Sequence, residues 1–271
     1  MRASGVLPMS RVRASSVAVI IPAHNASETL DRAVQSAVDS VAAARDKIPE
    51  LIPEIVVVDD LSTDNTRDII RAWSKKTPEI RLVTCEENQG PGFARNEGVR
   101  KTTASFLFFL DSDDVFYANH VHLCVRRLLE NDDLGYVFTK LHVDMQMHKQ
   151  WRNRLDESNP INFCVRRVWH DMILGFTEEP DFRNYRTEDT LYRRCLRDLV
   201  AHEQLDVETC EQFVSPGNTL DRQRDKFGMS MADWNAKVKA GERDDGFVLT
   251  DDMERVVEAR LTHVRNLLGG P

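Results

Sequence analysis

The 271-residue sequence lacks the patterns that mark several broad classes of protein. Its longest apolar runs, Val17–Pro22 and Phe106–Leu110, have the length of strands and are far too short to cross a bilayer, so we expect no transmembrane segment. It has no excess of basic residues, because 36 Lys and Arg stand against 44 Asp and Glu and give a formal net charge of −8. General binders of nucleic acid or of anionic membranes are usually basic, so we do not expect a nucleic-acid partner.

Cysteine is scarce, and its spacing fits neither disulfides nor a zinc site. The number of cysteines is odd and no two have C-x-x-C spacing, which argues against a disulfide framework and structural zinc. The five are Cys85, Cys124, Cys164, Cys195 and Cys210. Residues 1–13 contain no apolar core of a signal peptide. We therefore expect a cytoplasmic protein, and contact with the cytoplasmic face of a membrane stays open.

Strand-like and helix-like segments alternate through the first half of the chain. Short β-branched or aromatic runs predict buried parallel strands at Val17–Ile21, Ile55–Val58, Ile80–Thr84 and Phe106–Leu110. Helix-like segments lie between them, and Asn25–Glu28 has the polar cap and carboxylate of a helix start. This alternation predicts an α/β fold, a doubly wound and mostly parallel sheet flanked by helices.

The second half of the chain is less regular. Tyr136–Thr139 predicts one further strand, residues 144–187 show weak periodicity, and Glu188–Leu199 predicts a helix. Asp251–Leu268 predicts a terminal amphipathic helix, because its apolar residues line one side and Gly269 follows it. We expect a C-terminal helical extension that packs either on the core or on a second subunit, as in a homodimer.

Acidic residues end two of the predicted strands. Asp111–Asp114 follows the most apolar run, and Asp59 and Asp60 end an earlier one. Ligands of such sheets bind beyond the carboxyl ends of the strands. Three carboxylates in four residues repel one another unless a cation lies between them, and Mg²⁺ or Mn²⁺ prefers oxygen ligands. Asp60 could accept a hydrogen bond from the imide N–H of a uracil. Acidic turns with helix-capping aspartates would show the same residues.

A glycine-bearing loop, Asn88–Asn96, runs into a predicted helix. Its glycines permit close backbone approach, and Arg95 offers a forked donor to a phosphate or a base edge. An ordinary loop with a surface arginine would look similar. The loop contains neither a Walker motif nor a dinucleotide fingerprint, and no such fingerprint follows the first strand, which disfavours a nicotinamide oxidoreductase.

Four of these segments together resemble glycosyltransferase family 2, whose members have the GT-A fold. The matching pieces, in the family's order and spacing, are Val17–Asn25, Ile55–Asp64, Asn88–Gly98 and Phe108–Asp114. Leu61 stands where the family signature usually has glycine. The resemblance implies an inverting glycosyltransferase that moves a sugar from a nucleotide-sugar donor, a UDP-sugar in the first instance, to a saccharide or other hydroxyl acceptor. It also implies a divalent cation, Mn²⁺ or Mg²⁺.

The resemblance assigns roles by position. Asp60 would contact the base, Arg95 would hold the base or the diphosphate, and Asp111 would lie near the ribose. Asp113 would bind the metal, and Asp114 could share that role because the acidic motif aligns one residue either way. The residues assigned to the nucleotide site are Pro22, Ala23, Glu28, Asp60, Arg95, Asp111 and Ser112.

The helix predicted at Glu188–Leu199 begins with two acids, Glu188 and Asp189. Many family members place a Glu-Asp pair at the start of a helix beneath the acceptor site. The resemblance therefore implies that these two residues are catalytic and that Asp189 is the general base. The dipole of a helix favours an ionised carboxylate at its N-terminus, as a base requires. Plain helix capping would also place two acids here.

The resemblance divides the chain into a nucleotide-sugar-binding half (residues 16–135), an acceptor-binding half (136–225) and the helical extension (226–271). Two alternatives stay open. A haloacid-dehalogenase-like phosphatase would use Asp111 and Asp113 after an apolar strand, although its motif normally lies on the first strand of the sheet. A catalytically inactive protein would bind a nucleotide-sugar without transferring it. The sequence identifies neither the sugar nor the acceptor.

Overall fold

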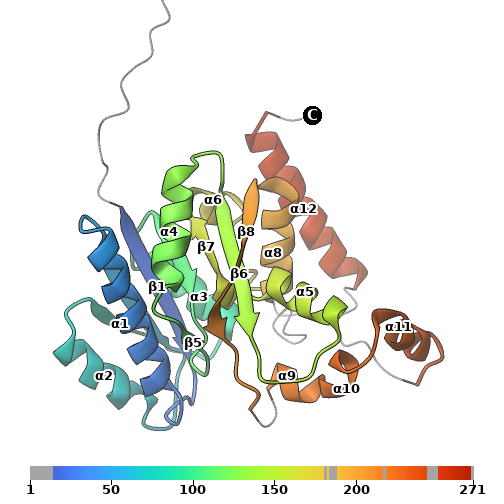
Figure 1. Cartoon of the computed structure of the whole chain (residues 1–271), viewed down its shortest axis with the longest axis horizontal. Coiled ribbons are helices and arrows are strands. Elements are labelled where there is room, and N and C mark those ends of the chain that lie inside the picture. Colours follow the sequence, from blue (N-terminus) through green and yellow to red (C-terminus); the bar gives the residue numbers. More distant parts are fainter. Residues whose placement is uncertain (1–14, 180–181, 183–187, 216–217, 243–249, 270–271) are drawn as a thin grey trace, which may run out of the picture.

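Eight strands form one sheet in the computed structural model, which describes residues 15–179, 182, 188–215, 218–242 and 250–269 (Figure 1). Within these residues the strand order is β3-β2-β1-β4-β7-β6-β8-β5. Helices cover both faces of the sheet, which confirms the predicted α/β class. Among the described helices, none combines the length and the apolar character needed to cross a membrane.

The first half of the chain forms the parallel part of the sheet. The central strand β1 (Ser16–Ala23) pairs in parallel with β2 (Ile52–Asp59) on one side and with β4 (Phe106–Phe109) on the other, and β2 pairs in parallel with β3 (Ile80–Thr84). All four predicted strands are confirmed. Because they run in the same direction, their carboxyl ends and the polar residues that follow meet at one edge of the sheet.

The second half of the chain adds antiparallel strands. After the short turn η1 (Pro160–Asn162), β7 (Phe163–Arg166) pairs antiparallel with β4 and with β6 (Tyr136–His142). Strand β8 (His202–Glu211) runs parallel to β6, and β5 (Val115–Phe116) pairs antiparallel with its end. The sequence pattern predicted β6 alone, because β5 and β7 are very short and β8 alternates with exposed polar residues.

One face of the sheet is covered by α1 (Leu30–Lys47), α2 (Thr66–Lys76), α4 (His120–Glu130) and α5 (Lys149–Ser158). Their apolar residues pack against alternate residues of β1 and β2, which form one continuous core. This alternation explains why the central strands are apolar without interruption, since a strand buried on both faces has no solvent-facing position. The core residues contributed by these two strands are Val17, Val19, Ile21, Ile55 and Val57.

The opposite face is covered by α3 (Pro91–Arg100), α6 (Arg167–Met172), α8 (Glu188–Leu199) and α12 (Asp251–Leu267). Helix α12 packs beside α8 and buries its apolar side in the second core of the protein. The predicted terminal helix therefore covers the core of its own chain. The residues that it buries are Met253, Val257, Leu261 and Val264.

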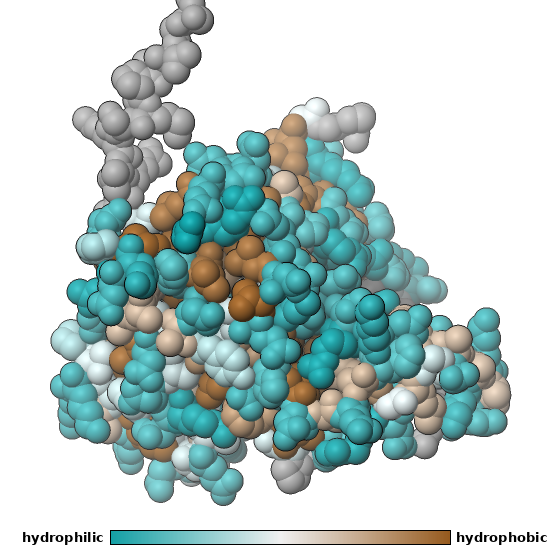
Figure 2. All heavy atoms as spheres, in the orientation of Figure 1, coloured by the Kyte–Doolittle hydropathy of each residue, from teal (hydrophilic) through white to brown (hydrophobic). Residues whose placement is uncertain are grey.

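Three short helices follow β8: α9 (Thr219–Arg222), α10 (Arg224–Phe227) and α11 (Met231–Lys239). Figure 1 shows α9 and α10 beyond the carboxyl end of β6, on the side where β1 also ends. The face seen in Figure 2 is mainly hydrophilic, with apolar surface at the C-terminal end of α12, where Leu267 and Leu268 are more than half exposed.

The start of α1 differs from the sequence-based prediction. Asn25 does not cap the helix, because its φ of 49° lies in the left-handed region, and the helix begins at Leu30. The Leu30 N–H donates to the Ala26 carbonyl oxygen (2.9 Å), so residues 26–29 form a turn before the helix. The polar residues predicted as a cap instead connect the loop after β1 to the loop after β2.

Close packing of α3 on the sheet requires glycine at position 98. An ideal Cβ at Gly98 would lie 2.5 Å from Ile20 Cγ2 and 3.2 Å from Val58 Cγ2, and both neighbours are buried strand residues. We therefore expect Gly98→Val to lower the free energy of unfolding by about 1–3 kcal/mol through overpacking. Chemical denaturation measures the change. Gly228→Ala is the control, since its nearest neighbour would lie at 3.7 Å, and a larger loss there would contradict the packing argument.

Candidate active site

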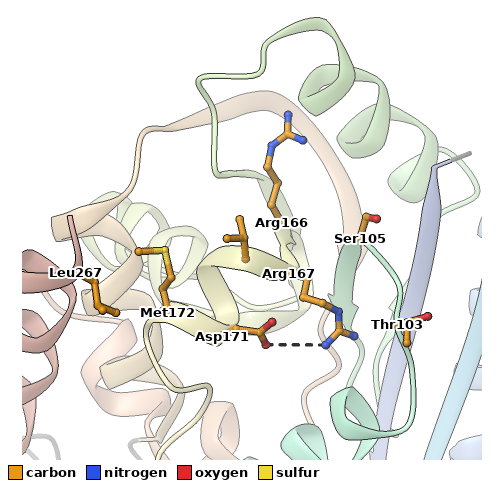
Figure 3. Close-up of a pocket in the computed structure, with 8 residues that line it drawn as sticks. Thr103, Ser105, Arg166, Arg167, Asp171, Met172 and Leu267 are labelled. Carbon is orange, nitrogen blue, oxygen red and sulfur yellow. Dashed lines mark ion pairs between the residues drawn. The ribbon is translucent and has the colours of Figure 1, made fainter. Parts of the chain in front are cut away.

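A cavity of about 620 Å³ lies at the amino edge of the parallel strands, lined in part by Ser105, Arg166 and Arg167 (Figure 3). Arg166 donates hydrogen bonds to the carbonyl of Leu128 (2.6 Å), and Arg167 donates to that of Ala104 (2.7 Å). These guanidinium groups are therefore bonded within the chain. None of the predicted site residues lines this cavity, so the carboxyl edge of the sheet is the better candidate.

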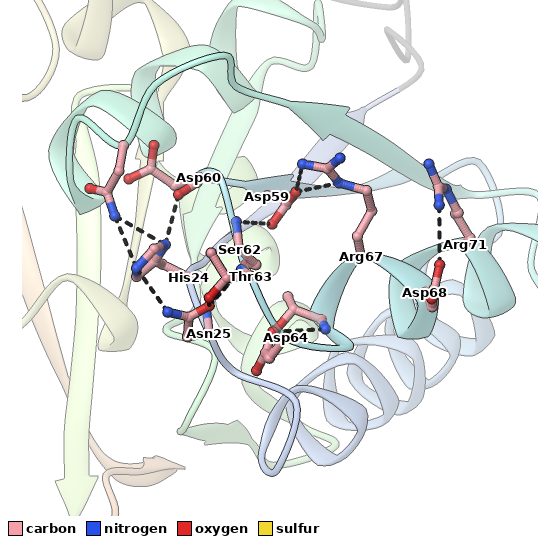
Figure 4. A network of polar contacts seen from close by, with 12 residues as sticks. His24, Asn25, Asp59, Asp60, Ser62, Thr63, Asp64, Arg67, Asp68 and Arg71 are labelled. Carbon is pink, nitrogen blue, oxygen red and sulfur yellow. Dashed lines mark hydrogen bonds and ion pairs between the residues drawn. The ribbon is translucent and has the colours of Figure 1, made fainter.

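The loops after β1 and β2 are held together at that carboxyl edge (Figure 4). His24 Nδ1 lies 2.8 Å from the Asp60 carbonyl oxygen, and the Asn25 side-chain oxygen accepts a hydrogen bond from the Thr63 N–H at 2.8 Å. Leu61, which replaces the usual glycine of the family, has a φ of 58° and so keeps the left-handed conformation that glycine favours. The departure from the family pattern therefore leaves this turn intact.

The two acids at the end of β2 have different surroundings. Asp59 is fully buried and forms an ion pair with Arg67 at 2.7 Å, so it stabilises the start of α2. The carboxylate of Asp60 accepts hydrogen bonds from the N–H groups of Gln89 (3.1 Å) and Gly90 (2.8 Å). Asp60 thereby positions the loop that begins α3. Since a carboxylate has about four acceptor sites, this one can still accept an N–H from a bound base.

The acidic loop after β4 presents Asp111, Ser112 and Asp113 as half-buried residues. Asp111 Oδ1 accepts a hydrogen bond from Arg95 Nη2 at 2.5 Å. Burial and then the charge of Asp111 raise the pKa of Asp113 above its ordinary value. Two carboxylates whose charges disfavour each other in this way provide a setting that a cation would stabilise.

Asp114 is directed toward the protein interior. Its side chain is buried, and Oδ1 accepts a hydrogen bond from the N–H of Phe213 at 2.9 Å, in the segment after β8. Burial, followed by the charges of Asp113 and Asp111, raises the pKa of Asp114 well above its ordinary value. The carboxylate therefore joins the acidic loop to the segment after β8, which leaves Asp113 better placed to meet a ligand from solvent.

The donor set fits a divalent cation that is shared with a bound diphosphate. Within the described ranges, no group of three or more His, Cys, Asp or Glu side chains is arranged to hold a metal by itself. Mg²⁺ in nucleotide sites commonly takes one or two carboxylates, with phosphate oxygens and waters as further ligands. Asp113 supplies a carboxylate of that kind, and the remaining ligands would come from the nucleotide and from water.

Helix α3 brings a buried arginine between the two sets of acids. The Arg95 side chain is 4% exposed, and its Nη1 lies 3.4 Å from Glu188 Oε1 while Nη2 contacts Asp111. Its guanidinium lies 5.1 Å from the centre of the Phe176 ring. Gly92 permits this approach, because an ideal Cβ there would lie 2.9 Å from Glu188 Cγ. Arg95 thus connects the end of β4 with the start of α8.

The Glu-Asp pair lies in the first turn of α8. Glu188 is buried, and Asp189 is half-buried beside it. Burial and then the charge of Glu188 raise the pKa of Asp189 to about 7, while the positive charge of Arg95 acts in the opposite direction. A carboxylate with a pKa near neutrality is suited to accepting a proton during a reaction.

The remaining predicted residues lie near the first strand. Pro22 and Ala23 end β1 and are buried, whereas Glu28 is exposed in the turn before α1. The structure therefore brings Arg95, Asp111 and Glu188 into direct contact, and it gives Glu28 no part in that cluster.

Two contributors to this region were missed by the sequence analysis. Arg32 of α1 donates a hydrogen bond to the Asp113 carbonyl oxygen (2.7 Å), and its guanidinium lies 3.7 Å from the centre of the Phe213 ring. Asn96 donates to the Phe176 carbonyl oxygen (2.9 Å) and accepts from the Phe176 N–H (3.0 Å). The position of Asn96 directly after Arg95, at the end of the Asn88–Asn96 segment, could have indicated its role. Nothing in the pattern of α1 distinguishes Arg32 from other surface arginines.

Comparison with protein families gives the class of the chain. The model of glycosyl transferase family 2 matches residues 18–199, and the chain belongs to this family. One relative is the succinoglycan biosynthesis protein ExoU of Rhizobium meliloti, 31% identical over 171 residues, which are 63% of this chain and 44% of ExoU. Another is the putative teichuronic acid biosynthesis glycosyltransferase TuaG of Bacillus subtilis, 38% identical over 98 residues, 36% of each protein. The chain spans less than half the length of these relatives.

Solved structures support the GT-A type of fold. TarS of S. aureus, in a crystal structure with UDP, superposes with a TM-score of 0.62 over 92% of this chain and 80% of the TarS chain, at 19% identity. The mannosyltransferase PcManGT of Pyrobaculum calidifontis, solved with GDP-Man and Mn²⁺, gives a TM-score of 0.58 over 93% of this chain and 74% of its own, at 16% identity. Membership in the family does not favour the phosphatase alternative.

The bond between Asp114 and Phe213 can be tested through stability. Asp114→Ala leaves the Phe213 N–H without its acceptor, so we expect a loss of about 1–3 kcal/mol in the free energy of unfolding. Asp114→Asn retains an acceptor oxygen and removes a buried carboxyl, so its stability should equal or exceed that of the wild type. Denaturant titration of the three proteins measures these free energies of unfolding. Equal stability of the wild type and Asp114→Ala would contradict a stabilising bond between Asp114 and the Phe213 N–H.

Proposed function

We propose that the protein is an inverting glycosyltransferase that moves a sugar from a UDP-sugar to a hydroxyl group of an acceptor, with Mn²⁺ or Mg²⁺ bound at Asp113. The observation that carries this proposal is the contact of Arg95 with Asp111 on one side and with Glu188 on the other. Arg95 thereby connects Asp111, which follows β4 and would lie on the donor side, with the acidic pair that begins α8 and would supply the base.

The donor would bind across the carboxyl ends of β1, β2 and β4. Asp60 would accept an N–H from the base, Pro22 and Ala23 would border the base and ribose, and Asp111 with Ser112 would lie near the ribose. Glu28 would complete the pocket from the turn before α1. Support for UDP comes from the TarS structures with UDP and with UDP-GlcNAc, and from a relative in Escherichia coli, WfgD, whose name specifies UDP-Glc.

Asp113 would hold the divalent cation against the donor diphosphate. When bound, such a cation neutralises negative charge on the departing nucleoside diphosphate. Asp114 is buried and holds the Phe213 N–H, whereas Asp113 is half-buried, so we assign the role to Asp113. The PcManGT complex with Mn²⁺ supports a divalent metal in this fold.

Asp189 would act as the general base, with Glu188 beside it. The carboxylate would take the proton of the acceptor hydroxyl as the hydroxyl oxygen forms a bond to the anomeric carbon. The bond between that carbon and the diphosphate oxygen breaks on the opposite side, which inverts the configuration. A base with a pKa near 7 exchanges protons effectively near neutral pH.

Residues 16–135 would then bind the nucleotide, residues 136–225 would bind the acceptor and supply the base, and residues 226–271 would support them. The acceptor would be a saccharide or another hydroxyl compound. A lipid-linked saccharide at the face of a membrane is one such compound, and the name of the relative WfgD includes a diphosphoundecaprenol acceptor.

Donor choice can be tested by thermal stability with a panel of nucleoside diphosphates and nucleotide-sugars, each with and without Mn²⁺. At one hundred times its Kd, a ligand stabilises the folded state by about 2.7 kcal/mol, which raises Tm by several degrees. We expect UDP or a UDP-sugar to give the largest increase, and Mn²⁺ to enlarge it. Asp113→Asn should keep the metal-free increase and lose the Mn²⁺-dependent part. A larger response to GDP would contradict the choice of UDP.

Asp189→Asn tests the base. Its amide cannot accept the proton, so we expect UDP binding within threefold of the wild type and a loss of about 10²–10⁴-fold in the rate of sugar transfer. In the wild type the rate should fall below about pH 7, because the base becomes protonated. Isothermal titration measures UDP binding, and a transfer assay over pH 5–9 measures the rate and its pH dependence. Wild-type transfer by Asp189→Asn would remove this residue as the base. A wild type that binds UDP and transfers no sugar would favour the inactive binding protein.

A further inference from the structure

The terminal nitrogens of Arg95 are directed at carboxylates of the protein, which does not suit a direct ligand of the donor. The Arg95 side chain is 4% exposed, its two terminal nitrogens contact Asp111 and Glu188, and its Nε is buried without a hydrogen-bond partner among the described residues. The guanidinium also lies against the ring of Phe176. Residues that hold a diphosphate need donors directed at the ligand, whereas these donors are directed at carboxylates of the chain itself.

The acids around Arg95 come from two elements that serve different substrates in the proposed reaction. Asp111 follows β4 on the donor side, and Glu188 and Asp189 begin α8 on the acceptor side. Among the residues that the structure describes, the charged groups that act on Asp189 are Glu188 on its own helix, Arg95 from α3 and Asp111 from the acidic loop. Both carboxylates disfavour a charge on Asp189, and Arg95 favours it. Within the described part of the chain, the positive charge of Arg95 therefore offsets part of the repulsion among these three acids.

We propose that Arg95 is a positioning residue that links the donor-side carboxylate Asp111 to the pair Glu188–Asp189 and favours the ionised form of Asp189, the base. This inference rests on the proposed function, in which Asp189 accepts the proton of the acceptor. It differs from the role implied by the family resemblance, in which Arg95 holds the base or the diphosphate of the donor.

The two partners of the Arg95–Glu188 ion pair should affect the pKa of Asp189 in opposite directions. Loss of the Arg95 charge leaves Asp189 with two neighbouring acids, so its pKa should rise. Loss of the Glu188 charge removes the neighbour that contributes most after burial, so the pKa of Asp189 should fall. Structural damage from breaking the same ion pair would not produce shifts of opposite sign.

The test compares Arg95→Met and Glu188→Gln with the wild-type full chain. Titration of aspartate side-chain carbons by ¹³C NMR, with Asp189→Asn to assign the signal, gives the pKa without any need for activity. We expect the Asp189 midpoint to rise by about one pH unit in Arg95→Met and to fall in Glu188→Gln. The acid limb of the pH–rate profile should move in the same directions.

Arg100→Met is the matched control on the same helix, because Arg100 pairs with Glu97 and Glu178 and is half exposed. It should leave the Asp189 midpoint unchanged. Arg95→Lys retains the positive charge, so it should return the midpoint toward the wild-type value, and it also provides a readout if Arg95→Met fails to fold.

Binding of UDP with Mn²⁺ separates this role from direct donor binding. We expect the Kd of Arg95→Met to stay within threefold of the wild type. A tenfold weaker Kd with an unmoved Asp189 midpoint would overturn the proposal, as would midpoints that move in the same direction in both variants. Opposite shifts together with a wild type that transfers no sugar would instead overturn the proposed function.

Discussion

The candidate site depends on the charge balance around one buried guanidinium. A cation that is almost excluded from water is costly unless carboxylates compensate its charge, and removing one partner of such a pair is strongly destabilising. Arg95 pairs with two acids that follow it in the sequence, Asp111 at a distance of 16 positions and Glu188 at a distance of 93 positions. The three residues come from α3, from the end of β4 and from the start of α8. Forming both ion pairs therefore holds distant segments of the chain together at one edge of the sheet.

The glycines of the Asn88–Gly98 segment serve the same assembly. A side chain at Gly92 would meet Glu188 and separate α3 from α8, which would lengthen the contact of 3.4 Å between Arg95 and Glu188. A side chain at Gly98 would meet Ile20 and lift α3 from β1. The occurrence of glycine and arginine in one segment thus has a common physical reason: the helix must lie close before its arginine can reach both acids.

The parallel part of the sheet was predictable because a strand buried on both faces leaves an uninterrupted apolar run, which is a strong signal in a sequence. The convergence of Asp60, Arg95 and the acidic loop followed from the strand ends and from the family resemblance. The orientation of Asp114 was not predictable, because its partner Phe213 follows β8, a strand that the sequence pattern did not reveal. The contact of Arg32 with the same segment was hidden for the same reason.

The C-terminal extension contributes to the support of the site. Helix α12 packs its apolar side beside α8, and its Glu254 forms an ion pair with Arg194 of α8 at 3.0 Å. Arg260 of α12 also donates a hydrogen bond to the Gly175 carbonyl oxygen at 2.7 Å, in the loop whose next residue, Phe176, lies against Arg95. One helix therefore holds both the element that carries Asp189 and the ring beside the buried guanidinium. Since the charge balance at Arg95 needs both in place, helix α12 supports the candidate site through these contacts.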